Sequence, residues 1–187
     1  MTAQETAWQA AESAAAVLAP DADVLASVDA AGLGSSTFAV LRRAAIKPAA
    51  TASAAMRYWT SVAMAGPVAA ARWMGMDAPP PVPVPEGDKR FADPTWADNP
   101  AFFAVRQAHL ATSRLISDLL EAGSGNAVDD AKATLATGFL LDALAPTNFL
   151  PTNPAALKRM FETGGTSLVA GASHFVEIGR ASCRERV

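Results

Sequence analysis

The chain has 187 residues, a net charge of −3 and an apolar fraction of 51%. This length fits one ordinary domain, or a domain with a tail. The charge and the absence of a basic run argue against a nucleic-acid partner. The single cysteine, Cys183, excludes an internal disulfide and a multi-cysteine metal site, and such cysteine usage is typical of the cytoplasm.

The sequence predicts neither a signal peptide nor a transmembrane span. Met1–Gln9 contains Glu5 and no basic cluster. The most apolar run, Val62–Ala71, has roughly half of the ~20 residues that a bilayer span needs, and Gly66 and Pro67 interrupt it. We therefore expect a cytoplasmic protein without a transmembrane helix.

Residues 1–77 form an alanine-rich region that the pattern of apolar residues and breakers predicts to be helical. Helices are expected over residues 6–19, 23–31, 38–46 and 53–74. Ser36 or Thr37 could cap the third of these helices, and Pro67 should kink or split the fourth. Trp59, Trp73 and Met74 could touch a membrane or another apolar surface, although packing between helices is the favoured interpretation.

Residues 78–87 read APPPVPVPEG and predict an extended linker, because proline lacks an amide donor and has a fixed φ. Residues 88–176 then predict a second helical region. Asp98 or Asn99 before Pro100, and Asn153 before Pro154, are the expected helix caps. Helices should cover 101–122, 129–144 and 154–161, with a further short helix from about residue 166. No strands occur at the density that an α/β core requires.

The last residues, 177–187, read EIGRASCRERV and are expected not to be native protein sequence. A common short-read sequencing adapter, translated in frame, matches Ile178–Val187 without a mismatch. The biological alternative is a basic tail in which Arg180 and Arg184 activate the Cys183 thiol. The favoured interpretation is adapter read-through, which places this segment outside any argument about fold or function.

Three sequence blocks carry a family resemblance. The first contains DKRF, ADPTW and NP within Asp88–Pro100, the second is LLDALAPTNFLPTNP at Leu140–Pro154, and the third is ETGGTSLVAG at Glu162–Gly171. In this order and spacing they resemble the amino-terminal region of the polyhydroxyalkanoate synthases, also called poly-β-hydroxybutyrate synthases. The resemblance covers about residues 88–176, whereas residues 1–80 resemble the family's variable extension only in being helical.

The resemblance implies an acyltransferase that polymerises 3-hydroxyacyl-coenzyme A into a storage polyester. Its catalytic half is an α/β-hydrolase fold with a cysteine nucleophile in G-x-C-x-G and partner aspartate and histidine residues. This sequence contains no G-x-C-x-G or G-x-S-x-G, and Cys183 lies in ASCRE. We therefore expect a mainly α region that covers a hydrolase core absent from this chain. We expect no catalytic, cofactor-binding or metal-binding residues, and no activity from the chain alone.

Several chemistry-bearing residues have structural interpretations that are favoured over functional ones. His109 lies on the apolar side of its helix and suits a core position better than a catalytic base, and His174 has no evident partner. Asp129 and Asp130 open a helix, where carboxylates complement the macrodipole. Gly164 and Gly165 lack the lysine and the preceding strand of a phosphate loop.

The charges at Asp88, Lys89 and Arg90 could contact coenzyme A phosphates, but a solvated cluster or an intramolecular ion pair is favoured. The expected partners are the rest of a synthase chain, a second copy of the chain and the polyester granule surface. An alternative is a free-standing granule-coat protein resembling a phasin, whose helices would be longer and less interrupted.

A chain that lacks the hydrolase core should expose the apolar side chains that normally contact it. Burial of each is worth roughly 1.5–3 kcal/mol, so we expect a helical but loosely packed chain. The residues concerned are Phe91, Trp96, Phe102, Phe103, Leu140, Phe149 and Leu150.

Overall fold

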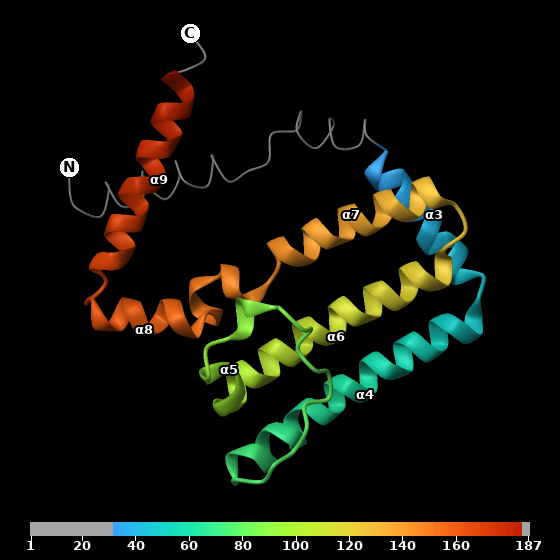
Figure 1. Cartoon of the computed structure of the whole chain (residues 1–187), viewed down its shortest axis with the longest axis horizontal. Helices are drawn as coiled ribbons and strands as arrows, with labels where there is room; N and C mark the ends of the chain where they lie inside the picture. The colour runs from blue at the N-terminus through green and yellow to red at the C-terminus, as the bar shows by residue number, and fades with distance from the viewer. Residues whose placement is uncertain (1–31, 185–187) are drawn as a thin grey trace, which may run out of the picture. The chain divides into compact units, whose positions relative to one another are not determined.

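The computed structural model describes residues 32–184, and their regular structure is entirely helical (Figure 1). The helices predicted over 6–19 and 23–31 lie outside the described residues. The α-helices are α3 (Leu33–Ala45), α4 (Pro48–Trp73), α5 (Thr95–Asp98), α6 (Pro100–Gly123), α7 (Ala127–Ala143), α8 (Pro154–Glu162) and α9 (Thr166–Arg184). Three 3₁₀ turns join them, η1 (Lys89–Phe91), η2 (Pro146–Asn148) and η3 (Leu150–Thr152). The prediction of a mainly α chain is confirmed, whereas the hydrolase core that it would cover stays a prediction.

The first compact unit comprises Met1–Thr51 and Leu119–Phe139, of which the part from residue 32 onward is described. Here α3 packs against the C-terminal turn of α6 and the first turns of α7. Val40, Ala44 and Ala133 are buried, and a Cβ at Gly123 would overlap the Val40 carbonyl group. The sequence predicts only that Gly123 ends a helix, but the close approach of two helices also requires a glycine at this position.

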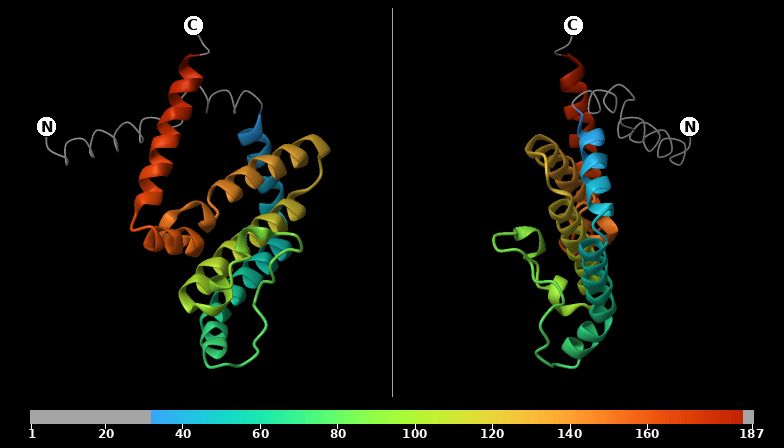
Figure 2. Two further views of the ribbon diagram at one scale, coloured as in Figure 1. Left: turned by 60° about the vertical axis from the view of Figure 1, so that its left-hand side comes forward. Right: turned by 90° about the vertical axis from the view of Figure 1, so that its right-hand side faces the viewer.

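The second unit comprises Ala52–Asp118 and Leu140–Val187. In Figures 1 and 2, α4 and α6 lie side by side and run antiparallel within it. The order of their contacts agrees, because Arg57 pairs with Asp118 and Val68 clusters with Phe103. The proline-rich segment after α4 then returns towards α6, where Val82 joins the main apolar cluster.

The main cluster of the second unit is aromatic. Phe91 and Trp96 meet edge to face with ring centroids 5.1 Å apart, and Trp96 meets Phe102 in the same way at 5.6 Å. Such pairs add to ordinary burial because ring edges and faces carry opposite partial charge. Phe91, Trp96 and Phe103 are buried within this chain, so the expectation that they would be exposed without a hydrolase core is wrong. Leu140 and Phe149 are exposed as expected, with 55% and 47% of their surface accessible.

Three local predictions on the helices also need correction. Ser36 and Thr37 do not cap α3, which begins earlier, at Leu33 after a left-handed Gly32 with φ 71°. Pro67 does not split α4, which is one 26-residue helix with Pro67 inside it; the kink that is the other expected effect of an interior proline stays a prediction. The helix from Thr166 is not short but extends for 19 residues, to Arg184. The origin of residues 177–187 stays a prediction.

Within residues 32–184, no helix is both long and apolar enough to cross a bilayer.

Candidate functional site

The Asp88–Phe91 motif forms an ion-pair cluster that ties the start of the second sequence region to the end of α7. Asp88 accepts a hydrogen bond from the Arg90 amide at 3.0 Å, and the Arg90 guanidinium pairs with Asp88 at 2.9 Å and with Asp142 at 2.7 Å. The hydrogen bond from the Arg90 side chain lowers the pKa of Asp88, and the same bond raises the pKa of Arg90. With two carboxylates already bound, Arg90 is poorly suited to hold a phosphate.

Next to this cluster, half-buried His109 lies beside the Phe91 ring, with ring centroids 5.9 Å apart. Burial lowers the pKa of His109, and the nearby Arg90 charge lowers it further, so the imidazole is neutral at pH 7. Its side chain makes no hydrogen bond within the described residues, so no nucleophile or orienting carboxylate there is bonded to it as in a catalytic triad. His174 is exposed on α9, with Nδ1 3.8 Å from a Glu177 carboxylate oxygen.

Asp93 connects the first sequence block to α8. Its Oδ1 accepts a hydrogen bond from the Thr95 amide at 2.8 Å, and its carboxylate pairs with Lys158 at 2.9 Å. The Thr95 side chain, and after it Lys158, hold the pKa of Asp93 at about 2. The expected caps are also present: Asn99 accepts from the Ala101 amide, and Asn153 from the Ala155 amide. These polar contacts order the loops between the helices.

Gln107 holds the proline-rich segment against α6. Its side-chain oxygen accepts from the Val82 amide at 2.9 Å, and its side-chain nitrogen donates to the Val82 carbonyl at 3.0 Å. Gln107 is 1% exposed, so both bonds are shielded from water. No sequence pattern indicates this role, because the return of residues 78–87 onto α6 is a tertiary event.

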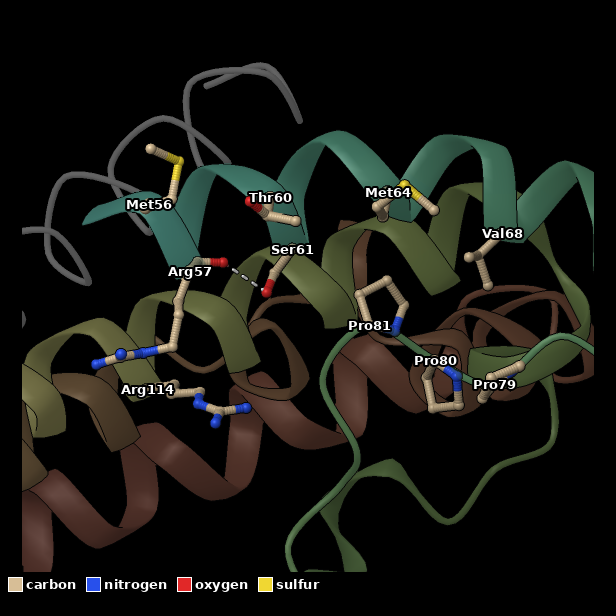
Figure 3. A pocket seen from close by; sticks show the side chains of 10 residues that line it. All are labelled: Met56, Arg57, Thr60, Ser61, Met64, Val68, Pro79, Pro80, Pro81 and Arg114. Carbon is tan, nitrogen blue, oxygen red and sulfur yellow. Dashed lines mark hydrogen bonds between the residues drawn. The ribbon is translucent and has the colours of Figure 1, made fainter. Parts of the chain in front are cut away.

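A groove of about 530 Å³ lies beside this segment, between α4 and the prolines (Figure 3). Met64 and Val68 line it from α4, and Pro79, Pro80 and Pro81 form the facing wall. Arg57 and Arg114 also line it, and Arg57 pairs with Asp118 at 3.0 Å. The sequence does not predict this groove either, since it depends on where the linker packs.

The aspartates and glycines that the sequence singled out lie at helix ends. Asp129 and Asp130 open α7 as expected, but both also pair with Arg43 of α3, at 3.1 and 2.9 Å. Gly164 and Gly165 both have positive φ in the turn between α8 and α9.

The tryptophans expected to pack between helices do not do so. Trp59 and Trp73 of α4 are 64% and 76% exposed, and Met74 directly after the helix is 65% exposed, so the favoured packing interpretation is wrong for all three. Among the residues that the structure describes, no three His, Cys, Asp or Glu side chains gather as a metal site would require. Cys183 lies in the part of α9 whose side chains the structure does not describe.

These features define a helical polypeptide whose helices are separated by short ordered loops. A family described as the N-terminus of poly-beta-hydroxybutyrate polymerase (PhaC) matches residues 87–182. The chain belongs to this family, as the three sequence blocks predicted. No solved structure matches the chain.

Relatives with this similarity are named as polymerases of poly(3-hydroxyalkanoate). The chain is 38% identical over 90 residues to poly(3-hydroxyalkanoate) polymerase 1 of Ectopseudomonas oleovorans, covering 48% of this chain and 16% of that protein. It is 36% identical over 103 residues to the polymerase of Methylorubrum extorquens, covering 54% and 17%. It is 33% identical over 93 residues to the polymerase subunit PhaC of Cupriavidus necator, covering 50% and 16%. The chain thus spans about a sixth of the length of the curated relatives that it matches.

Proposed function

We propose that this chain is the non-catalytic N-terminal region of a polyhydroxyalkanoate synthase, an enzyme that polymerises 3-hydroxyacyl-coenzyme A and releases coenzyme A. The observation that carries the proposal is the family match over residues 87–182, with relatives named as polymerases of which the chain spans about a sixth. The chain by itself is inactive, because its sequence has no G-x-C-x-G nucleophile motif. Among the described residues, its histidines also have no catalytic partners.

Within the synthase, the chain covers the catalytic core with the segment that runs from the end of α7 to α9. Large apolar side chains lie exposed along this segment, within the region that matches the family. They are Leu140, Leu144, Phe149, Phe161, Leu168 and Val169. Solvent exposure of so many large apolar groups in one segment is unfavourable and is typical of a surface that contacts another protein surface. The remainder of the synthase chain is the proposed partner.

A second proposed contact is with another copy of the chain or with the polyester granule, in the cytoplasm, through the exposed Trp59 and Trp73. The phasin-like alternative is not favoured. The described chain is punctuated by η1, α5, η2 and η3 between its longer helices, whereas a coat protein needs long uninterrupted apolar stripes.

Coenzyme A release from 3-hydroxybutyryl-coenzyme A tests the proposed inactivity. The purified chain should release no more coenzyme A than a blank without protein, whereas the polymerase of Cupriavidus necator serves as the active control. Release above the blank that disappears in Cys183→Ala would contradict the proposal.

Complementation in trans tests the covering role. The chain should raise polymer formation by a synthase from which the family-matched segment has been deleted. Phe149→Asp with Leu140→Asp should abolish this effect, and Val128→Asp, at a similarly exposed apolar residue of the first unit, should not. Equal loss in both variants, or no complementation by the wild-type chain, counts against a covering role.

A further inference from the structure

Arg106 on α6 is a buried cation without a counter-ion. The residue is 7% exposed, and its Nε is the one fully buried side-chain nitrogen or oxygen among the described residues that has no hydrogen-bond partner. The terminal nitrogens make no hydrogen bond or ion pair within residues 32–184 either. Arg43, Arg57, Arg90 and Lys158, in contrast, each reach a carboxylate.

A second guanidinium contacts the same aromatic ring. The Arg106 guanidinium carbon is 5.2 Å from the centre of the Phe103 ring, and that of Arg72 is 5.5 Å from the same centre. Arg72 donates one hydrogen bond to the Ala78 carbonyl at 3.1 Å. Burial lowers the pKa of Arg106, and the nearby Arg72 charge lowers it further. Two like charges therefore share one aromatic ring.

No carboxylate within residues 32–184 forms an ion pair with either guanidinium. Asp77 and Asp98 line a hollow together with Arg72, but neither forms an ion pair with it. A buried charge that lacks a partner is strongly unfavourable, and structures usually avoid it by pairing the charge. The cation–π contacts with Phe103 recover only part of this cost. An arginine in this setting is typical of a group that pairs with an anion from elsewhere.

We propose that Arg72, Phe103 and Arg106 form a binding site for a carboxylate. A planar carboxylate can accept two hydrogen bonds from one arginine at the same time, and the terminal nitrogens of Arg106, which are not among the fully buried unpaired atoms, can supply both. Arg72 supplies the second positive charge, and both guanidinium groups contact the Phe103 ring. The adjacent Val68, Ala69 and Ala78 form an apolar cluster with Phe103, which excludes water and strengthens the ion pair. This site does not depend on the proposed function.

The Nε–H resonance of Arg106 in the NMR spectrum of the 187-residue chain tests the site directly. Titration with acetate at constant ionic strength should shift this resonance in a saturable manner, and chloride should not. Arg106→Met should weaken acetate binding by about tenfold or more, the loss expected when a charged hydrogen-bonding partner is removed. Arg114→Met, on the same helix and exposed, is the matched control and should bind as the wild type does.

Thermal unfolding gives a second readout that does not require the resonance to be assigned. Without carboxylate, Arg106→Met should raise the melting temperature. Methionine removes the unpaired buried charge and keeps much of the length of the arginine side chain. Saturating acetate should raise the melting temperature of the wild type and leave that of Arg106→Met unchanged. The difference in melting temperature between Arg106→Met and the wild type should therefore become smaller, or change sign, as acetate is added.

The source of the carboxylate is resolved by a series of alkanoates. Acetate and propionate match the side chains of Asp and Glu, so equal binding of acetate, propionate and hexanoate identifies a carboxylate side chain of a protein as the partner. Binding that tightens with alkanoate length identifies a free carboxylate with an apolar tail, held beside Val68 and Ala69. Absence of any carboxylate-dependent shift, an equal effect of chloride, or a response to inorganic phosphate alone would overturn the proposal.

Discussion

Gly123 at the end of α6 lies directly against Val40 of α3. A Cβ at Gly123 would overlap the Val40 carbonyl oxygen and lie 2.8 Å from the carbonyl carbon. These are backbone atoms of a buried residue, so they cannot move aside as a flexible side chain would. The two helices can approach to this distance only because residue 123 has no side chain.

Gly123→Ala should therefore destabilise the chain by about 1–3 kcal/mol, the usual cost of forcing an extra methyl group into a packed contact. Gly138→Ala is the matched control, because Gly138 lies inside α7 and a Cβ there would meet no atom within 4 Å. That change should stabilise by about 0.5–1 kcal/mol through helix propensity. Urea denaturation monitored by circular dichroism measures both. Stabilisation by both substitutions would show that α3 and α6 do not pack in this way.

Arg43 is expected to resist replacement by lysine. Its Nε donates to the Gly123 carbonyl at 2.7 Å, and its two terminal nitrogens pair with Asp129 and Asp130. A lysine ammonium is a single point and cannot reach all three acceptors at once. Arg43→Lys should lower the melting temperature, whereas Arg42→Lys, at the neighbouring exposed residue, should leave it unchanged. Equal melting temperatures for both variants would mean that the three contacts contribute nothing to stability.

Gln107 should be needed to keep the proline-rich segment on α6. In Gln107→Leu, the Val82 amide and carbonyl lose their partner in a buried environment, which costs about 1–3 kcal/mol for each unsatisfied group. Hydrogen exchange of the Val82 amide should accelerate in this variant by more than the global loss of stability predicts. Thr112→Ala, on an exposed part of the same helix, is the control. Unchanged exchange at Val82 in Gln107→Leu would contradict the assigned role.

Local signals in the sequence are sufficient for most helix boundaries. The asparagine caps at Asn99 and Asn153 are predictable, because each precedes a proline and its side chain can reach the first free amides of the helix. Ser36 resembles a cap in the sequence, but its actual partner is Asp129, which is far away along the chain. Periodicity and capping rules cannot predict contacts between residues that are so far apart in the sequence.

The same limit applies to the candidate sites. The roles of Gln107 and Arg106 depend on where residues 78–87 pack, and a proline-rich segment predicts extension but not direction. Burial of Phe91 and Trp96 is not predictable from local pattern, because their partners, Val82 and Leu110, come from that segment and from α6. Membership of the family, in contrast, is predictable from the three sequence blocks, because it requires no tertiary information.

Asp93 should make the chain sensitive to acid. Its pKa is held at about 2, below the ordinary value of 3.8, by hydrogen bonds from Thr95 and then by Lys158. Because the folded pKa lies below the unfolded pKa, the charged carboxylate stabilises the folded state above about pH 4. This contribution declines as the pH falls from about 4 to about 2, where Asp93 becomes protonated in the folded state as well. Lys158 is half exposed, so solvent screens its share of the effect.

Asp93→Asn isolates this titration, since an asparagine oxygen can still accept from the Thr95 amide while the charge is lost. The variant should be less stable than the wild type at about pH 6, and the difference should vanish as the pH approaches about 2. Urea denaturation at intervals across this range measures how the free energies of unfolding of the two proteins converge.

Asp77→Asn is the control, because Asp77 is exposed and makes no ion pair within the described residues. Its free energy of unfolding should match that of the wild type across the same range. Lys158→Met should retain most of the pH dependence, because the Thr95 hydrogen bonds remain. A difference between wild type and Asp93→Asn that is constant across this range would show that Asp93 titrates alike in the folded and unfolded chains, contrary to the structure.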